Sequence, residues 1–355
     1  MLRVLELFAG IGACSKALTN LGIEHEIVDA VEIDKYAVKS FNAVHGTNFE
    51  PQDITKWDKD IECDLIMHGS PCQDFSVAGR GAGGDKDSGT RSSLMYETLR
   101  IVEKLRPKYV IWENVKNLLS KKHRHNFDAY LDAMTDLGYA NNYQVLNAKD
   151  YGVPQNRERV FTVSIRKDIY NGYFFPAPIP LEKRLKDIVE SEVDEKYYLS
   201  DEQLKSLMSS NYDQNKRFYK TGGCSPTIST MGGGQRQPKI AEPVIVASRG
   251  RNPDNPSDRT TGAPTVQRLE FNTRGTTNTI TSVQKDNYVC ESLGGCRIRK
   301  LTPRECWRLM GFSDTDFDKA KGAGISNTQL YKQAGNSIVV DVLMAIFKEL
   351  LCQKQ

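Results

Sequence analysis

The sequence lacks the marks of several protein classes. It has no CxxC motif, its eight cysteines stand at irregular spacings, and it holds only five histidines. A disulfide framework and a zinc site are therefore disfavoured. No apolar run approaches the roughly 18 to 20 residues that a membrane span needs, and Met1 leads directly into a strand-like stretch without a signal-peptide pattern. We expect a cytoplasmic protein with no bound metal and no membrane association.

Net charge is also small, at +3 over 355 residues, but it is unevenly spread. Residues 216–300 carry 14 Lys and Arg against 6 Asp and Glu, whereas the rest of the chain is net acidic. A basic region of this kind suits a polyanion such as nucleic acid. A solvated surface would carry the same charges, so charge alone does not decide between the two.

Short apolar runs alternate with amphipathic stretches from residue 1 to about residue 178. The runs are RVLELFAG, EIVDAVEID, CDLIMHGS, PKYVIWENV, YQVLNA and RVFTVSI. This alternation predicts βαβ units and an α/β, Rossmann-like doubly wound fold, with a mainly parallel sheet covered by helices on both faces. In such folds ligands bind beyond the carboxyl ends of the strands.

The pattern changes at FFPAPIP (174–180), where prolines cluster and the chain becomes rich in Gly, Thr, Ser, Arg and Asn. We expect a smaller, mainly β and irregular domain over 179–321 that begins with a hinge. Two segments in it, SPTISTMGGG and TNTITSVQKD, echo each other. The tail, 322–355, contains a predicted turn and amphipathic helix over 331–351 that would pack back and complete the 1–178 domain.

The loop after the first strand, FAGIG, favours a nucleoside ligand. Gly10 and Gly12 permit a tight turn and a close backbone approach, but the third glycine of a dinucleotide fingerprint is absent. Glu32 ends the next strand, where a carboxylate can accept both ribose hydroxyls, and Asp53 is placed to reach an adenine amino group. A glycine turn beside solvated acids is the alternative interpretation.

Cys72 follows the run CDLIMHGS, in a loop at the end of a predicted strand. A cysteine becomes a good nucleophile only when its thiolate is stabilised. Glu113 ends the next run and Arg157 and Arg159 begin the last one, at neighbouring positions on one edge of the sheet. We interpret the other seven cysteines as core or surface residues.

Seven segments in order make the chain resemble the DNA cytosine-5 methyltransferase family, in particular its bacterial and phage members. They are ELFAGIGACSKAL, VEIDKYA, GSPCQDFSVAG, ENV, YGVPQNRERVF, and, after a variable region, RKLTPRECWRLMGF with GNSIVVDVL. The resemblance implies that Cys72 is the nucleophile, Glu113 activates cytosine, and Arg157 and Arg159 surround the base.

The resemblance also implies S-adenosylmethionine as the methyl donor. Its expected binding residues are Phe8, Ala9, Gly10, Ile11, Gly12, Glu32, Ile33, Asp53, Ile54, Gly69, Pro71, Leu94, Asn336 and Ser337. Residues 180–298 match the family's target recognition domain by position only. The residues that we expect at the DNA are Gln73, Ser76, Arg80, Arg91, Thr227, Thr230, Arg236, Thr279 and Thr281.

Cytosine chemistry explains these residue types. A thiolate that adds to carbon 6 turns carbon 5 into a nucleophile for the methyl group, and the target base must first be flipped out of the duplex. The glycine-rich loop 79–91 would then close over the DNA, although a surface loop without this function has the same composition.

The expected partner is double-stranded DNA, bound by a monomer in a bacterial cell or a phage-infected host, with a cognate restriction endonuclease acting separately where one exists. An RNA cytosine-5 methyltransferase and a catalytically silent DNA-binding homologue remain alternatives. An oxidoreductase would share only the fold class.

Overall fold

A six-stranded sheet of order β2-β1-β3-β4-β7-β5 forms the centre of the molecule. The computed structural model describes residues 1–71, 94–200, 202–203, 219, 221–230, 238–240, 244–253, 255, 266–270, 288–290 and 298–352. The strands of the sheet are β1 (Leu2–Leu7), β2 (His25–Val31), β3 (Leu65–His68), β4 (Tyr109–Val115), β5 (Tyr139–Asn147) and β7 (Glu158–Arg166).

Four neighbouring strands, β2, β1, β3 and β4, run parallel, and β7 lies antiparallel between β4 and β5. Each of the six apolar runs forms one of these strands, because runs of branched and aliphatic side chains suit strands buried on both faces. The mainly parallel, Rossmann-like sheet predicted from the alternation is confirmed.

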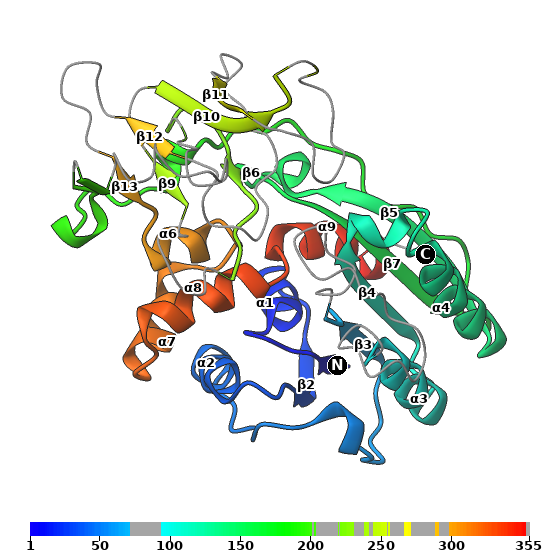
Figure 1. Ribbon diagram of the computed structural model, residues 1–355. Helices are drawn as coiled ribbons and strands as arrows, with labels where there is room; N and C mark the ends of the chain where they lie inside the picture. The colour runs from blue at the N-terminus through cyan, green and yellow to red at the C-terminus, as the bar shows by residue number, and fades with distance from the viewer. Residues whose placement is uncertain are drawn as a thin grey trace.

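Helices cover both faces of this sheet (Figure 1). One face packs in an apolar cluster with α1 (Ala13–Asn20) and α9 (Val340–Leu351). The other face packs with α3 (Met95–Leu105) and α4 (Arg124–Asp136). Helix α2 (Lys35–His45) begins where the Asp34 carboxylate accepts the Tyr36 N–H at 2.9 Å, and it ends at Gly46.

The C-terminal part returns to the large sheet through α6 (Pro303–Arg308), α7 (Asp314–Gly322), α8 (Asn327–Asn336) and α9. Residues 331–336 continue α8 rather than forming the expected turn, and the chain breaks direction only at Ser337–Val339. Helix α7 packs against α2, and Trp307 of α6 shares the apolar cluster of α9. The boundaries 1–178 and 179–321 stay a prediction, but 303–321 packs with the first domain.

Short strands make up the region between the sheet and α6. They are β6 (Gln155–Asn156) paired with β8 (Ser225–Pro226), β9 (Lys239–Ile240) paired with β13 (Arg299–Lys300), and a three-stranded sheet of β10 (Val244–Arg251), β11 (Val266–Glu270) and β12 (Tyr288–Cys290). The β10 sheet stands at the far end from β2 and α2 (Figure 1). Within the described ranges, no helix is long and apolar enough to cross a membrane.

Candidate active site

A cavity of about 500 Å³ opens at the carboxyl ends of the parallel strands. Loops after β1, β2 and β3, the end of β4, the start of β7 and the end of α8 all line it. Ten of the residues expected at the methyl donor contribute to its wall: Phe8, Gly10, Glu32, Ile33, Asp53, Ile54, Gly69, Pro71, Leu94 and Asn336. Ala9 and Ser337 line a smaller neighbouring cavity.

Glu32 anchors the middle of this cavity. One of its oxygens accepts the Gly10 N–H at 3.1 Å and the other accepts the Asp34 N–H at 2.8 Å. Burial raises the pKa of this carboxyl, while the two N–H groups oppose that rise. The carboxylate is thus held in place between the β1 and β2 loops, where a hydroxyl-rich ligand can still donate to it.

The glycine loop does not present a phosphate cradle. The Gly10 N–H is donated to Glu32, and the Gly12 N–H is donated to the Ala9 carbonyl at 3.0 Å. A pyrophosphate site needs such N–H groups aimed at the ligand. The donor set, with carboxylates at Glu32 and Asp53 and apolar walls, therefore fits a nucleoside such as that of S-adenosylmethionine better than a dinucleotide.

Gly12 and Ile11 support the loop from behind. Gly12 has a φ of +80°, and a Cβ there would overlap the His45 ring of α2. The His45 Nε2 lies 3.2 Å from the Ile11 carbonyl oxygen, and burial lowers the pKa of this ring to about 4. A neutral imidazole therefore holds the loop backbone, and Ile11 and Gly12 contribute packing rather than cavity wall.

The far end of the cavity is formed by Asp53, Ile54 and Ile33. The Asp53 side chain accepts the Thr55 N–H at 3.0 Å and the Thr55 hydroxyl at 2.8 Å, which lowers its pKa. Ile33 is 70% exposed, so it offers an apolar surface beside these groups. A flat, amino-bearing ring would find both packing and an acceptor here.

Glu113 and Arg159 line the other end of the 500 Å³ cavity. They meet across the β4–β7 pairing, where the Arg159 Nε lies 3.0 Å from the Glu113 Oε1. Both side chains are largely buried and both line the 500 Å³ cavity. The structure thus brings together two of the predicted catalytic residues in one pocket with the predicted donor-binding groups.

Arg157 is placed differently from Arg159. Its side chain is 4% exposed, and its guanidinium donates to the carbonyls of Ile228 at 3.0 Å, Gly335 at 3.3 Å and Ser337 at 2.9 Å. These acceptors belong to the small region and to the tail. Arg157 therefore joins three separate parts of the chain at the cavity wall.

The cysteines with described side chains are poor nucleophiles, except at the C-terminus. Burial raises the pKa of Cys63 to about 12 and of Cys224 to about 11, and it also raises the pKa of Cys14 and of Cys306 well above the usual value. Cys352 is exposed on the last turn of the chain. None of these five lies in the 500 Å³ cavity.

Several predicted residues lie outside the described ranges. They are the nucleophile Cys72, the DNA contacts Gln73, Ser76, Arg80, Arg91, Arg236, Thr279 and Thr281, and the loop 79–91. Pro71, which precedes Cys72, lines the cavity beside Gly69. Their assignments stay predictions.

Thr227 and Thr230 were both expected to read bases, and they differ in position. Thr227 is 4% exposed and its hydroxyl donates to the Asn156 carbonyl at 3.0 Å. Thr230 is half-buried and follows it by three residues. The assignment of both threonines to the DNA stays a prediction.

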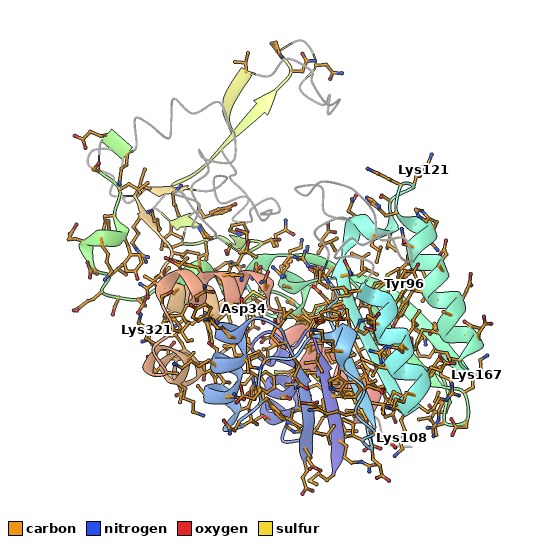
Figure 2. All side chains as sticks on the ribbon, turned by 60° about the horizontal axis from the view of Figure 1, so that its bottom comes forward. Asp34, Tyr96, Lys108, Lys121, Lys167 and Lys321 are labelled. Atoms are coloured by element: carbon orange, nitrogen blue, oxygen red, sulfur yellow. The ribbon has the colours of Figure 1, made fainter. Side chains whose placement is uncertain are left out.

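Sequence reasoning missed part of the cavity wall. The additional lining residues are Val31, Asp34, Ala37, Gln52, Ser70, Lys332, Gln333 and Gly335. Lys332 and Asp34 form an ion pair of 2.6 Å, and Gln333 donates to the Tyr36 carbonyl at 2.9 Å. Figure 2 shows Asp34 beside α8. Val31, Asp34 and Ala37 lie within VEIDKYA, Ser70 within GSPCQDFSVAG and Gly335 within GNSIVVDVL, whereas Gln52, Lys332 and Gln333 only adjoin such signals. Among the described residues, no cluster of His, Cys, Asp or Glu could hold a metal ion.

Comparison with known proteins adds independent findings. Residues 2–352 match the family described as C-5 cytosine-specific DNA methylase. An orphan methyltransferase of Bacillus phage SPbeta is 35% identical over 99% of this chain and 97% of the relative. A type II methyltransferase of Lactococcus lactis subsp. cremoris is 34% identical over 99% of both chains.

Solved structures agree on the fold. The S. pombe Dnmt2 methyltransferase superposes with a TM-score of 0.69 at 20% identity, covering 99% of this chain and 98% of the other. A putative DNA modification methyltransferase encoded within an E. coli prophage gives a TM-score of 0.59 at 20% identity, covering 99% and 98%.

Proposed function

The chain belongs to the C-5 cytosine-specific DNA methylase family and is a DNA cytosine-5 methyltransferase, and we propose that it methylates a specific cytosine in duplex DNA through a covalent adduct with Cys72. The observation that carries this proposal is a single cavity. It holds a nucleoside-type end, built around Glu32 and Asp53, and a base-type end, built around Glu113 and Arg159.

S-adenosylmethionine, when bound, supplies an electrophilic methyl group. Glu32 would accept the ribose hydroxyls, and Asp53 with Ile33 and Ile54 would hold the adenine ring. Phe8 and Leu94 add apolar wall. These residues orient the donor and exclude water from one side of it.

The cytosine would enter at Glu113 and Arg159. The Cys72 thiolate attacks carbon 6 while Glu113 holds a proton at ring nitrogen 3, and this makes carbon 5 electron-rich. The Arg159 guanidinium, 3.0 Å from Glu113, is placed to hydrogen-bond the ring carbonyl while it keeps Glu113 oriented. Loss of the carbon 5 proton to water and departure of Cys72 complete the cycle.

Access to this pocket requires the base to leave the helix, at a cost of a few kcal/mol. The basic region 216–300 supplies charge for the DNA backbone. Full-length similarity to phage orphan and type II methyltransferases supports a role in host or phage DNA modification, as an orphan enzyme or beside a separate endonuclease.

Transfer of labelled methyl groups tests the proposal. We expect label from S-adenosylmethionine in duplex DNA, none in transfer RNA, and none in either from Cys72→Ser. Label in transfer RNA alone would identify an RNA enzyme, and a Cys72→Ser protein that keeps its turnover would exclude the covalent mechanism. No label in either substrate, from a protein that still binds DNA, would favour the silent homologue.

A further inference from the structure

Behind the active site lies a second, smaller cavity of about 40 Å³. Its wall includes Glu6 of β1, Gly69 after β3, and Glu113 at the end of β4. A volume of this size admits water, which needs about 10 to 15 Å³ for one probe sphere, together with polar partners. Two carboxyl groups provide those partners.

Strand register places these groups on one face of the sheet. Glu6 pairs with Met67, and Met67 pairs with Ile111, so all three point to the same side. Glu113 lies two residues beyond Ile111 and shares that side. Gly69 follows β3, the strand between those that carry Glu6 and Glu113, and a Cβ added there would sit 3.7 Å from the Glu113 Oε2, so its missing side chain leaves this space open.

Glu6 is a buried acid that forms no ion pair with any basic side chain in the described ranges of the chain. It is 3% exposed, and its Oε1 accepts both the N–H, at 3.0 Å, and the hydroxyl of Ser15. Burial raises the pKa of Glu6 to about 7, and the Ser15 hydrogen bonds act against that rise. The remaining titratable side chain in the cavity wall is Cys14, whose thiol burial keeps protonated.

We propose that Glu6 and Glu113 share one proton through water in this cavity, so that Glu6 supplies the proton that Glu113 presents to ring nitrogen 3. This inference rests on the role proposed above for Glu113. At rest the proton resides on Glu6, and the Glu113 carboxyl lies beside the Arg159 guanidinium, with 3.0 Å between Arg159 Nε and Glu113 Oε1.

The proton balance is complete within the site. Glu6 first passes its proton through water to Glu113. When the thiolate adds to carbon 6, the π electrons of the carbon 5–carbon 6 bond move between carbon 4 and carbon 5, those of the carbon 4–nitrogen 3 bond move onto nitrogen 3, and nitrogen 3 takes the proton from Glu113. Both side chains are then carboxylates, and the N–H and O–H of Ser15 stabilise the Glu6 anion. When Cys72 leaves, the proton returns from nitrogen 3 by the same route.

Single-turnover methyl transfer, measured against pH, tests this relay. The wild-type rate of methyl transfer should fall at alkaline pH as Glu6 loses its proton, and this fall is the alkaline limb of the pH profile. Glu6→Gln should abolish that alkaline limb and lower the maximal rate by roughly tenfold or more. Ser15→Ala keeps the acid but removes a hydrogen bond to its anion, so it should move the limb to higher pH, which a merely structural Glu6 would not do.

Gly69→Ala gives a second approach, because the added methyl group meets its neighbours only at ordinary contact distances, 3.6 and 3.7 Å, while filling the path. It should slow transfer and remove the alkaline limb. Asp64→Asn is the matched control: Asp64 is a buried acid just before β3, paired with Arg3 and Lys108 at the opposite end of the sheet, and its loss should leave the limb unchanged.

A wild-type alkaline limb that persists in Glu6→Gln and does not move in Ser15→Ala would overturn the relay. Wild-type enzyme that methylates DNA in the same experiment would leave the proposed function standing. Absence of methyl transfer in the wild type would instead count against the function itself.

Discussion

Two arginines two positions apart have separate tasks at the residue scale. Arg157 is buried and its N–H groups donate to main-chain carbonyls of distant segments, whereas Arg159 contacts Glu113 in the cavity. Lysine lacks the fork of donors that either position uses. Arg157→Lys should therefore cost about 3 kcal/mol of stability, since buried carbonyls lose their partners.

Arg159→Lys should behave in the opposite way, with stability within about 1 kcal/mol of wild type and methyl transfer slower by roughly 10²-fold. Urea unfolding and single-turnover rates on the two variants separate the tasks. A stable Arg157→Lys protein with an equally large loss of rate would assign Arg157 to the cytosine itself.

Glu6 also sets a pH dependence of stability. Its pKa is raised from the ordinary 4.5 to about 7, so its contribution is fully present below pH 4.5 and is lost as pH rises through 7. Wild type should lose about 3 kcal/mol relative to Glu6→Gln between about pH 5 and about pH 9. Urea unfolding at both pH values measures this difference, and parallel changes in the two proteins would show that Glu6 is not buried as an acid.

At the scale of elements, the end of α8 packs directly on segment 221–230. A Cβ on Gly335 would overlap the Ser229 carbonyl and the Thr230 nitrogen. Gly335→Ala should destabilise the protein by about 2 kcal/mol or more, although alanine is intrinsically favoured in helices by about 1 kcal/mol. Thermal unfolding provides the measurement.

Gly322→Ala is the control for that substitution, because Gly322 also lies in a helix, α7, and a Cβ there meets nothing within 4 Å. It should be neutral or stabilising. Equal effects at both glycines would mean that the contact between α8 and segment 221–230 carries no energy.

The ion pair between Lys332 and Asp34 ties α8 to the start of α2 across the rim of the large cavity. Because such a half-exposed pair contributes about 0.2 to 1 kcal/mol and is screened by salt, Lys332→Met should weaken S-adenosylmethionine binding by about two- to fivefold, and less at high salt. Lys16→Met, which removes the more deeply buried pair with Asp316 between α1 and α7, away from this cavity, should leave calorimetric affinity unchanged. Equal losses would exclude a local effect at the rim.

Local sequence patterns predicted the strands of the sheet well, but they did not predict the contacts between segments that are distant in the sequence. Six apolar runs predicted six strands, because a buried strand shows itself as a run of consecutive apolar residues. The partners of Arg157 could not be predicted, because they lie about 70 and 180 positions away. The continuation of α8 to Asn336 was missed since its Gly335 looks like a turn signal until its packing on Ser229 is known.

The whole molecule places residues from both ends of the chain around one site. Phe8 and Asn336 line the same cavity, and α1 packs against α9. Strand-end motifs in the sequence predicted Gly10, Glu32 and Asp53 at this cavity, and the resemblance to the family implied most of its other lining residues. It could not predict the wall that α8 adds at Lys332 and Gln333, because that wall depends on how the tail returns to the sheet.

Covalent trapping tests the central claim most directly. A duplex with 5-fluorocytosine at the target position cannot lose the group on carbon 5 as a proton, so the adduct should persist. Peptide mapping after incubation with S-adenosylmethionine should find the DNA attached to Cys72, and Cys72→Ser should give no adduct. Attachment to another cysteine, or methylation of ordinary DNA without any trapped adduct, would contradict the account.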